Sequence, residues 1–435
     1  MRSLAIAAAL SLALPALPAR AAVEITWWHA MEADLGQKAQ KLADDFNKSQ
    51  SDFHVTPVYK GSYADTLNAA IAAFRAGQQP DIVQVFEVGT GSMMAAKGAI
   101  TPIYKLMAEQ GEAFDPKAYL PAVTGYYTDP AGEMLSFPFN SSTPILYFNK
   151  DAFKKAGLDP DKAPATWPEL AEDARKLQSA GTACGFTVEW PSWTQVENFS
   201  ALHNIPLSTR DNGFSGLDAT FSFNNALVER HIAELGEWQK SKLFDYGGRE
   251  GKARTKFVSG ECGVTIASSA ARSGIIANAK FAVGFGMQPY YADVKGAPQN
   301  SIIGGASLWV LSGRPAAEYK GVAKFLSFLA SPPAQAWWHQ NTGYLPVTLA
   351  AYELSQSQGY YDQNPGADVS IKQMNLNPPT ANSKGLRYGN FIQIRAIIEE
   401  SMENVFSGKQ DAKAALDEAA ARGDALLRQF EDANK

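Results

Sequence analysis

Short apolar runs alternate with amphipathic helical patterns along most of the 435-residue chain, and this alternation constrains the fold more than any other feature. Near the N-terminus, the run 23–28 precedes a helical pattern at 35–46, and the run 55–59 precedes another at 67–74. The next run, 82–86, has the continuous apolar character of a strand buried on both faces. Strands that alternate with helices predict a sheet with helical crossovers, and therefore an α/β protein.

The same alternation returns after Asn140 and predicts a second lobe. The further expected strands lie at 144–149, 184–188, 264–267, 282–286 and 307–312, and the further expected helices at 151–156, 166–177, 316–329, 333–340, 391–406 and 412–430. We therefore expect two α/β lobes, each a mostly parallel sheet flanked by helices, with hinge crossovers between them. The predicted boundaries are 22–140 plus 269–315 for lobe 1, and 141–268 plus 316–435 for lobe 2.

The first residues of the chain predict export. Arg2 is followed by an apolar run at 4–17 and then by Ala19-Arg20-Ala21, which is the pattern of a signal peptide with its cleavage site. We expect residues 1–21 to be a signal peptide that is cleaved after Ala21. No later run of about 18 apolar residues predicts a further membrane-spanning helix. The formal net charge of −5 and the lack of a Lys/Arg-rich run argue against nucleic acid as a partner.

Two cysteines, Cys184 and Cys262, each begin a predicted strand. Two are too few for a disulfide scaffold or a Cys-rich metal site. Neighbouring parallel strands would bring them together, and an exported protein meets an oxidising compartment. The sequence leaves open whether they form a disulfide or remain two buried thiols.

Motifs for catalysis, metals and nucleotide cofactors are missing from the sequence. The five histidines show no paired spacing of a zinc site, and there is no GxSxG, SxxK or CxxC. The Gly-rich stretches at 89–91 and 304–305 fit neither a dinucleotide fingerprint nor a P-loop. The 44 acidic residues still allow a pair of carboxylates in space. The sequence therefore predicts no metal and no cofactor, and it favours a binding protein over an enzyme.

Polar and aromatic side chains follow several predicted strands at their carboxyl ends, where open α/β sheets bind ligands. The residues in these positions are Tyr63, Glu87, Trp190, Trp193 and Ser268. Ser268 also precedes a predicted helix, whose first N–H groups would favour an anion. Each residue alone is explained equally well as a loop tyrosine, a surface carboxylate, a core tryptophan or a helix-capping serine. Together they predict one ligand-binding cleft.

Arg395 is the most informative single residue. It lies four residues after Phe391 and three before Ile398, so it shares the apolar stripe of its predicted helix. A guanidinium in that position needs a partner. That partner is either a buried Asp or Glu, as a structural ion pair, or a phosphate or carboxylate group of a ligand.

Two stretches of sequence carry a resemblance to a known family. The first is Pro138-Phe139-Asn140-Ser141-Ser142-Thr143-Pro144, which leads to 147–150 and 164–170, and the second is 325–332, followed by Trp338 and 342–347. These stretches resemble the extracellular solute-binding proteins of ABC importers. One departure is Phe148, where the family usually has Tyr, and we expect it to affect packing more than function. The likeness covers nearly the whole chain after residue 21.

This resemblance implies a two-lobed periplasmic binding protein whose lobes close over a ligand. It also implies that the closed form docks, as a monomer, on the permease of an importer driven by an ATPase at the inner membrane. The implied ligand is sn-glycerol-3-phosphate, with a glycerophosphodiester such as glycerophosphocholine as the alternative and a neutral oligosaccharide third. Outside this class, an exported hydrolase of phosphate esters is the alternative.

The resemblance also implies which residues bind the ligand. They are Tyr63, Glu87, Ser142, Ser268, Gly305, Tyr344 and Arg395, with Trp190 and Trp193 lining the cleft. Because they donate hydrogen bonds, Arg395, the two serine hydroxyls, the Gly305 N–H and Tyr344 are expected to hold phosphate. Glu87 can only accept, so it is expected to take the glycerol hydroxyls with Tyr63 beside it, while the tryptophans cover the carbon backbone.

Overall fold

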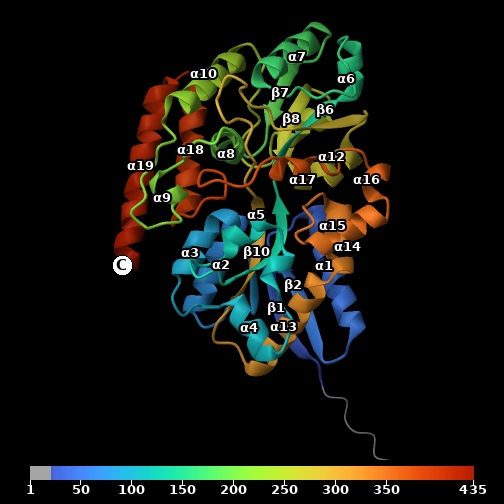
Figure 1. Ribbon diagram of the computed structural model, residues 1–435, viewed down its shortest axis with the longest axis vertical. Coiled ribbons are helices and arrows are strands. Elements are labelled where there is room, and N and C mark those ends of the chain that lie inside the picture. The colour runs from blue at the N-terminus through green and yellow to red at the C-terminus, as the bar shows by residue number, and fades with distance from the viewer. Residues whose placement is uncertain (1–20) are drawn as a thin grey trace, which may run out of the picture.

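Two separate β-sheets organise residues 21–435, which are the residues that the computed structural model describes. Each sheet with its helices forms one lobe, and the lobes are stacked along the long axis of the molecule (Figure 1). The predicted two-lobed α/β fold is confirmed. The predicted signal peptide lies outside the described residues, apart from its last residue, Ala21. Within 21–435 no helix combines the length and the apolar character needed to cross a membrane.

The first lobe is built on a six-stranded mixed sheet. Its strands are, in spatial order, β2 (Phe53–Tyr59), β1 (Val23–His29), β3 (Ile82–Phe86), β10 (Gly304–Leu311) and β4 (Ile100–Thr101), with β5 (Phe137–Ser142) also pairing with β10. Its helices are α1 (Ala33–Ser49), α2 (Tyr63–Arg75), α3 (Thr90–Ala95), α4 (Ile103–Gln110), α5 (Pro121–Tyr127), α13 (Ala316–Ala330), α14 (Pro332–Thr342), α15 (Leu349–Ser357) and α16 (Tyr360–Gln363). The lobe's main core lies between this sheet and helices such as α1, α4 and α13.

The second lobe is built on a four-stranded sheet. Its strands are, in spatial order, β7 (Cys184–Val188), β8 (Cys262–Ser268), β6 (Pro144–Asn149) and β9 (Val283–Met287). Its helices are α6 (Lys150–Lys155), α7 (Trp167–Ser179), α8 (Asn198–Leu202), α9 (Thr209–Asn212), α10 (Ala226–Lys240), α11 (Arg254–Val258), α12 (Arg272–Asn278), α17 (Val369–Met374), α18 (Phe391–Phe406) and α19 (Ala412–Asn434).

The strand directions correct one expectation. The sheets are mixed and not mostly parallel, because β10 runs antiparallel to β3, β4 and β5, and β6 runs antiparallel to β8 and β9. Among the paired strands of residues 21–435, the β1–β2, β1–β3 and β7–β8 pairs are parallel. The chain enters β6 and β10 directly from the other lobe, at the opposite end of the sheet from the one that a helical crossover would reach. These two strands therefore run antiparallel to their neighbours.

The lobe boundaries need correction in two places. The prediction placed 269–315 in lobe 1, but β9 pairs with β6 in the second sheet, so the chain returns to the first lobe only at β10. The prediction placed 316–435 in lobe 2, but α13 packs on β1 and α4, and α14 packs on α1. The helices from α13 to α16 therefore belong to the first lobe, and the second lobe resumes at α17.

Local signals in the sequence explain how the predicted elements begin and pair. Thr166 and Glu169 form a capping box at the start of α7, and Ser62 forms another with Asp65 at the start of α2. Cys184 and Cys262 lie directly opposite each other in the parallel pair β7–β8, with Cα atoms 4.6 Å apart, and form a disulfide. The open question about the two cysteines is thereby settled.

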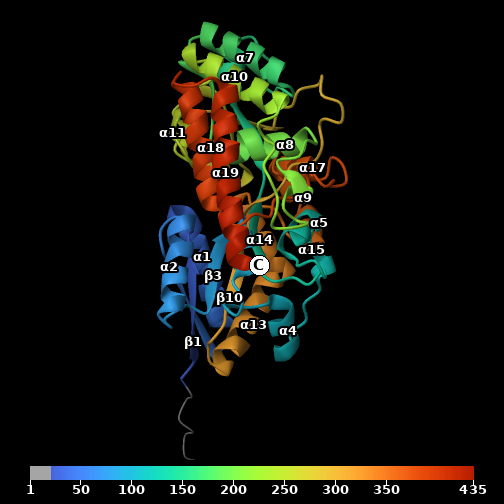
Figure 2. The same ribbon diagram turned by 90° about the vertical axis from the view of Figure 1, so that its left-hand side faces the viewer.

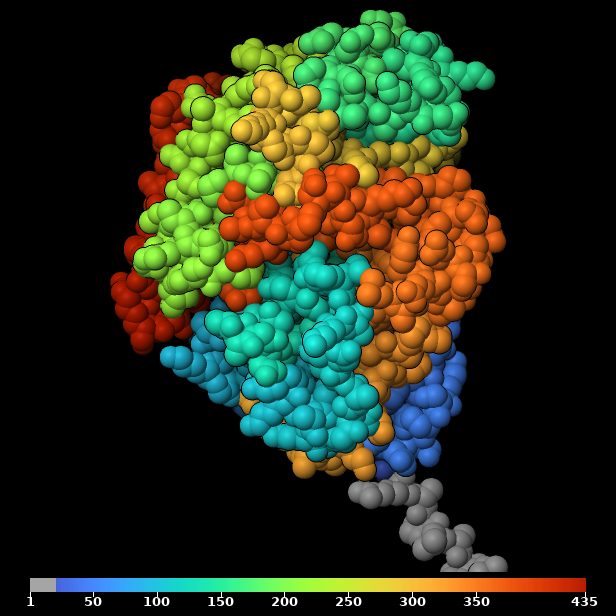
Figure 3. Space-filling model, viewed as in Figure 1, coloured from blue at the N-terminus to red at the C-terminus, as the bar shows by residue number. Residues whose placement is uncertain are grey.

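Within residues 21–435 the chain crosses between the lobes three times, most directly between β5 and β6. β5 ends at Ser142 and β6 begins at Pro144, so one extended stretch leaves the first sheet and enters the second. The other crossings follow β9 and α16. In the space-filling view an orange-red band between the lobes contains the chain between α17 and α18 (Figure 3). There Arg387 donates from Nη2 to the Thr128 carbonyl of the first lobe at 2.7 Å, and from its backbone N–H to the Asn212 carbonyl of the second at 3.0 Å.

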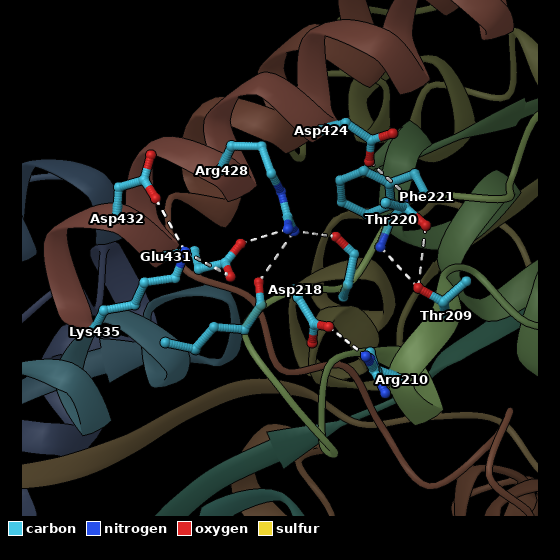
Figure 4. A network of polar contacts seen from close by, with 12 residues as sticks. Thr209, Arg210, Asp218, Thr220, Phe221, Asp424, Arg428, Glu431, Asp432 and Lys435 are labelled. Carbon is cyan, nitrogen blue, oxygen red and sulfur yellow. Dashed lines mark hydrogen bonds and ion pairs between the residues drawn. The ribbon is translucent and has the colours of Figure 1, made fainter.

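Two long C-terminal helices, α18 and α19, pack side by side along one edge of the second lobe (Figure 2). Polar contacts tie the loop 209–221 to α19 (Figure 4). Asp424 accepts a hydrogen bond from the backbone N–H of Phe221 at 2.8 Å, and Arg428 donates to the carbonyl of Ala219 and pairs with Glu431. This packing holds α18 in place, and α18 carries Arg395 into the cleft.

Candidate functional site

A cavity of about 570 Å³ lies between the two lobes. All nine residues that the sequence singled out line it: Tyr63, Glu87, Ser142, Trp190, Trp193, Ser268, Gly305, Tyr344 and Arg395. The structure thus brings together side chains from both lobes that are up to 332 positions apart. That each of them contacts a ligand stays a prediction. In the part of the chain from 21 to 435, no group of three or more His, Cys, Asp or Glu side chains is arranged to hold a metal ion.

Arg395 joins the two lobes through a buried charged group that we call the Arg395 cluster, formed by Arg395, Glu87 and Glu197. Its Nε and Nη2 donate to the two carboxylate oxygens of Glu197 at 2.8 and 2.6 Å, and Nη2 also donates to Glu87 at 2.8 Å. Glu87 follows β3 in the first lobe, whereas Glu197 and Arg395 belong to the second. Of the two alternatives for Arg395, the structure therefore shows pairing with buried carboxylates.

The electrostatics of this cluster are dominated by burial. Burial raises the pKa of Glu87, and the nearby Arg395 guanidinium opposes that rise. Burial disfavours the charge of Arg395 itself, but Glu197 and Glu87 outweigh it and raise the pKa of the guanidinium. Two carboxylates against one guanidinium leave the cluster with a net negative formal charge. Such a group accepts hydroxyl donors well and repels an anion.

A chain of side-chain amides positions Tyr63 beside this cluster. Gln84 accepts from the backbone N–H of Ala30 and donates to Asn140 at 2.8 Å, and Asn140 donates to the Tyr63 hydroxyl at 3.0 Å. The Tyr63 ring stacks on Phe86 with centroids 5.2 Å apart. Burial raises the pKa of Tyr63 well above its usual range, so its hydroxyl keeps its proton and can donate it.

Four donors gather where the chain crosses between the lobes, and we call Ser142, Ser268, Gly305 and Tyr344 the donor pocket. Strand pairing places them together: Gly304 lies opposite Ser142, Gly305 opposite Ser141, and Pro144 opposite Ser268. The backbone N–H of Leu345, next to Tyr344, donates to the Ser141 carbonyl at 2.8 Å. Burial raises the pKa of Tyr344, which keeps this hydroxyl protonated. None of the four side chains or backbone groups carries a formal charge.

Glycine is required at two neighbouring positions of this pocket. Gly305 has φ +93°, and a Cβ there would lie 1.8 Å from the carbonyl oxygen of Asn140. A Cβ on Gly304 would lie 2.4 Å from the indole ring of Trp193. The Gly304-Gly305 pair thus lets a strand and a tryptophan approach the ligand space closely, which explains a Gly-rich stretch that fits no nucleotide motif.

Trp190 and Trp193 come from a strained segment that follows β7. Trp190 has φ +52°, a conformation rare for a bulky side chain. Trp193 begins a π-helical turn, Trp193–Glu197, which is a rare element frequently found at functional sites. The same short segment therefore supplies both cleft tryptophans and the carboxylate that holds Arg395.

Among the charged residues of the site that sequence reasoning missed, three take part in its buried ion pairs. Glu197 lies in a π-helical turn with no periodicity to reveal it, and Arg254 begins a five-residue helix, α11. Glu189 follows β7 directly. The rule that ligand-binding residues follow the carboxyl ends of strands (the strand-end rule), which singled out Trp190, therefore applied to Glu189 equally. Arg254 lines the cavity and donates from Nε and Nη2 to the fully buried Glu189 at 2.9 and 2.6 Å.

Comparison with known proteins gives the class of this chain. The model of the family described as bacterial extracellular solute-binding protein matches residues 30–336. The chain is 52% identical over 436 residues to the sn-glycerol-3-phosphate-binding periplasmic protein UgpB of Yersinia enterocolitica, covering 100% of this chain and 99% of that protein. It is also 52% identical to the protein of that name from Pectobacterium atrosepticum, covering 99% of this chain and 97% of the relative. The chain belongs to the bacterial extracellular solute-binding proteins, a family of binding proteins and not of enzymes.

Solved structures agree on the fold. The crystal structure of UgpB from Mycobacterium tuberculosis in complex with glycerophosphocholine has a TM-score of 0.79 and 21% identity, covering 94% of this chain and 99% of that one. Maltose-bound MalE3 of T. maritima has a TM-score of 0.76 and 18% identity, covering 93% and 100%. At these identities the likeness shows a shared two-lobed fold.

Proposed function

We propose that the protein binds sn-glycerol-3-phosphate in the cleft between its lobes and delivers it to an ABC importer. This proposal rests on one observation: a single cavity presents two different chemical environments. The uncharged donor pocket lies where the chain crosses between the lobes, and the net-negative Arg395 cluster lies elsewhere on the cavity wall. A molecule with a phosphate at one end and hydroxyls at the other complements both. The name printed for relatives 52% identical over the whole chain supports the same ligand.

The phosphate belongs in the donor pocket and not on Arg395. The hydroxyls of Ser142, Ser268 and Tyr344 can each donate a hydrogen bond, as a phosphate oxygen requires. Arg395, in contrast, already donates three charge-assisted hydrogen bonds to Glu87 and Glu197. This revises the expectation from sequence, which placed Arg395 on the phosphate.

The glycerol hydroxyls belong at the Arg395 cluster. Glu87 is an acceptor, and its side chain lines the cavity although the residue is only 6% exposed. Among the described residues, Nη1 of Arg395 has no hydrogen-bond partner, so it can donate to a hydroxyl oxygen. The Trp190 and Trp193 rings also line the cavity and cover the carbon backbone of the ligand.

A glycerophosphodiester is the second candidate, favoured by the size and lining of the cavity. The volume of about 570 Å³ exceeds what a phosphorylated three-carbon molecule fills. The exposed carboxylates of Glu32 and of Asp34, which pairs with Lys38, also line the cavity. These acidic groups, with Trp190, suit a cationic head group such as choline.

The cellular context follows from the same proposal. We expect cleavage after Ala21, release into the periplasm, and docking of the closed monomer on the permease subunits of an ATPase-driven importer. The periplasmic naming of the relatives and the pattern of residues 1–21 support this location.

Isothermal titration and thermal unfolding of the purified protein with sn-glycerol-3-phosphate, glycerophosphocholine and maltose test the proposal. A ligand at 100 times its Kd adds about 2.7 kcal/mol to the free energy of unfolding. We expect sn-glycerol-3-phosphate to stabilise the protein and to be recovered intact. The double variant Ser142→Ala/Ser268→Ala should bind it more weakly, whereas Ser312→Ala, at the far end of β10, should not. Stabilisation by maltose alone, or consumption of the ester, would refute the proposal.

A further inference from the structure

We propose that Arg254 is the cation that recognises the phosphate and gives the cleft its preference for an anionic ligand. This inference rests on the proposed function and deepens it. It concerns a residue outside the set that sequence reasoning and the family resemblance singled out.

Three basic side chains of the described chain line the cavity: Arg254, Arg395 and Lys252. Arg395 is held by two carboxylates, so its surroundings are net negative. Arg254 is held by one carboxylate, Glu189, so this pair is neutral. No second carboxylate of the described residues pairs with Arg254, although Glu250 of the same segment also lines the cavity, and the third guanidinium nitrogen can donate to an anion. Lys252 is exposed and makes no ion pair within the described residues, so it is a flexible charge in solvent.

The position of Arg254 places it on the donor-pocket side of the cavity. Its helix, α11, packs on β8, the strand that ends at Ser268, and on α12, which follows Ser268 closely in the chain. Its Nη1 lies 4.0 Å from where a Cβ on Gly274 of α12 would be. Burial raises the pKa of Tyr344 and of Tyr147, and the positive charge of Arg254 opposes both rises; the Tyr147 hydroxyl donates to the Ser268 carbonyl at 2.7 Å. Arg254 therefore acts electrostatically on two hydroxyls in or next to the donor pocket.

Glu189 makes Arg254 a pre-oriented donor. The carboxylate is fully buried and takes Nε and Nη2 in a bidentate pair, while 37% of the arginine side chain remains exposed. This arrangement uses the two nitrogens on one edge of the guanidinium and leaves Nη1 for another group. A guanidinium oriented in this way, lining the same cavity as uncharged hydroxyls, can bind phosphate oxygens with directional, charge-assisted hydrogen bonds.

Titration of sn-glycerol-3-phosphate into the full-length exported protein and its variants tests this inference. We expect Arg254→Met to weaken binding by at least about tenfold, because a hydrogen bond to a charged group is lost. Arg254→Lys should recover most of that loss, because it restores the charge. The matched control is Arg249→Met, another half-exposed arginine of the second lobe, which pairs with Glu403 and does not line the cavity.

Removing Arg254 alone leaves Glu189 buried without a partner, so the double variant Glu189→Gln/Arg254→Met is measured as well. Wild-type affinity in this double variant, or a larger loss for Lys252→Met than for Arg254→Met, would overturn the inference. So would a loss in Arg254→Lys equal to that in Arg254→Met. The proposed function fails separately, if the wild-type protein does not bind sn-glycerol-3-phosphate at all.

Discussion

Replacing Arg395 by methionine should destabilise the protein in a strongly pH-dependent way. The substitution keeps an apolar chain of similar length in α18 but removes the guanidinium that donates to Glu197 at 2.8 and 2.6 Å and to Glu87 at 2.8 Å. Glu197 is 1% and Glu87 7% exposed at the side chain. Breaking a buried ion pair by removing one partner costs about 3–5 kcal/mol, because the remaining charge is left uncompensated. We expect a loss of that size at pH 8.

The loss should shrink as the pH falls. Burial already raises the pKa of Glu87 above its ordinary value of 4.5, and removing the opposing guanidinium raises it further. A carboxyl whose pKa is higher in the folded than in the unfolded state keeps its stability at low pH and loses it as the pH rises through the folded-state pKa. Each unit of difference corresponds to about 1.4 kcal/mol. The variant should therefore be closer to wild type at pH 5 than at pH 8.

Urea unfolding at both pH values, followed by tryptophan fluorescence, measures these differences. The control is Arg422→Met, which removes the pair with Glu400, in which both side chains are more than 40% exposed, and should cost at most about 1 kcal/mol. The double variant Arg395→Met/Glu197→Gln should regain part of the lost stability at pH 8. A cost below about 1 kcal/mol at pH 8, or an equal cost at both pH values, would refute this account of the cluster.

Two further predictions concern stability. Burial raises the pKa of Glu399 from its ordinary value of 4.5 to about 7, so the destabilisation caused by its ionisation builds up between these two pH values and is complete above about 7. Glu399→Gln should therefore add up to about 3 kcal/mol to the free energy of unfolding at pH 8 and much less at pH 5. Urea curves at the two pH values check this, and an equal gain at both would contradict it. Reducing the Cys184–Cys262 disulfide, whose ends are 78 residues apart, should cost about 4 kcal/mol through the entropy of the unfolded chain. Unfolding with and without reductant measures that cost, with Cys184→Ala/Cys262→Ala as the control, and identical curves would contradict the prediction.

Much of the local structure could be predicted from the sequence, because burying one face of a helix or strand imposes a regular spacing on its apolar residues. The strand β1 and the helices α7, α13 and α18 lie within a few residues of their predicted bounds. The strand-end rule also found five of the cleft residues, since a carboxyl end of a strand marks an edge of the sheet whichever lobe it belongs to. Short elements such as α11 and the π-helical turn have too few residues to show a period, so Arg254 and Glu197 were missed.

Periodicity and neighbours along the chain therefore sufficed to predict the elements, the α/β class and six of the nine expected cleft residues, whereas Ser142, Gly305 and Tyr344 came from the family resemblance. The tertiary structure decided the strand directions, the membership of β9 and α13 in their lobes, and the partners of Arg395. Glu87 is 308 positions and Glu197 198 positions from Arg395. No local pattern encodes contacts at such separations, because they exist only once three crossings of the chain have stacked the two sheets and placed α18 over the cleft.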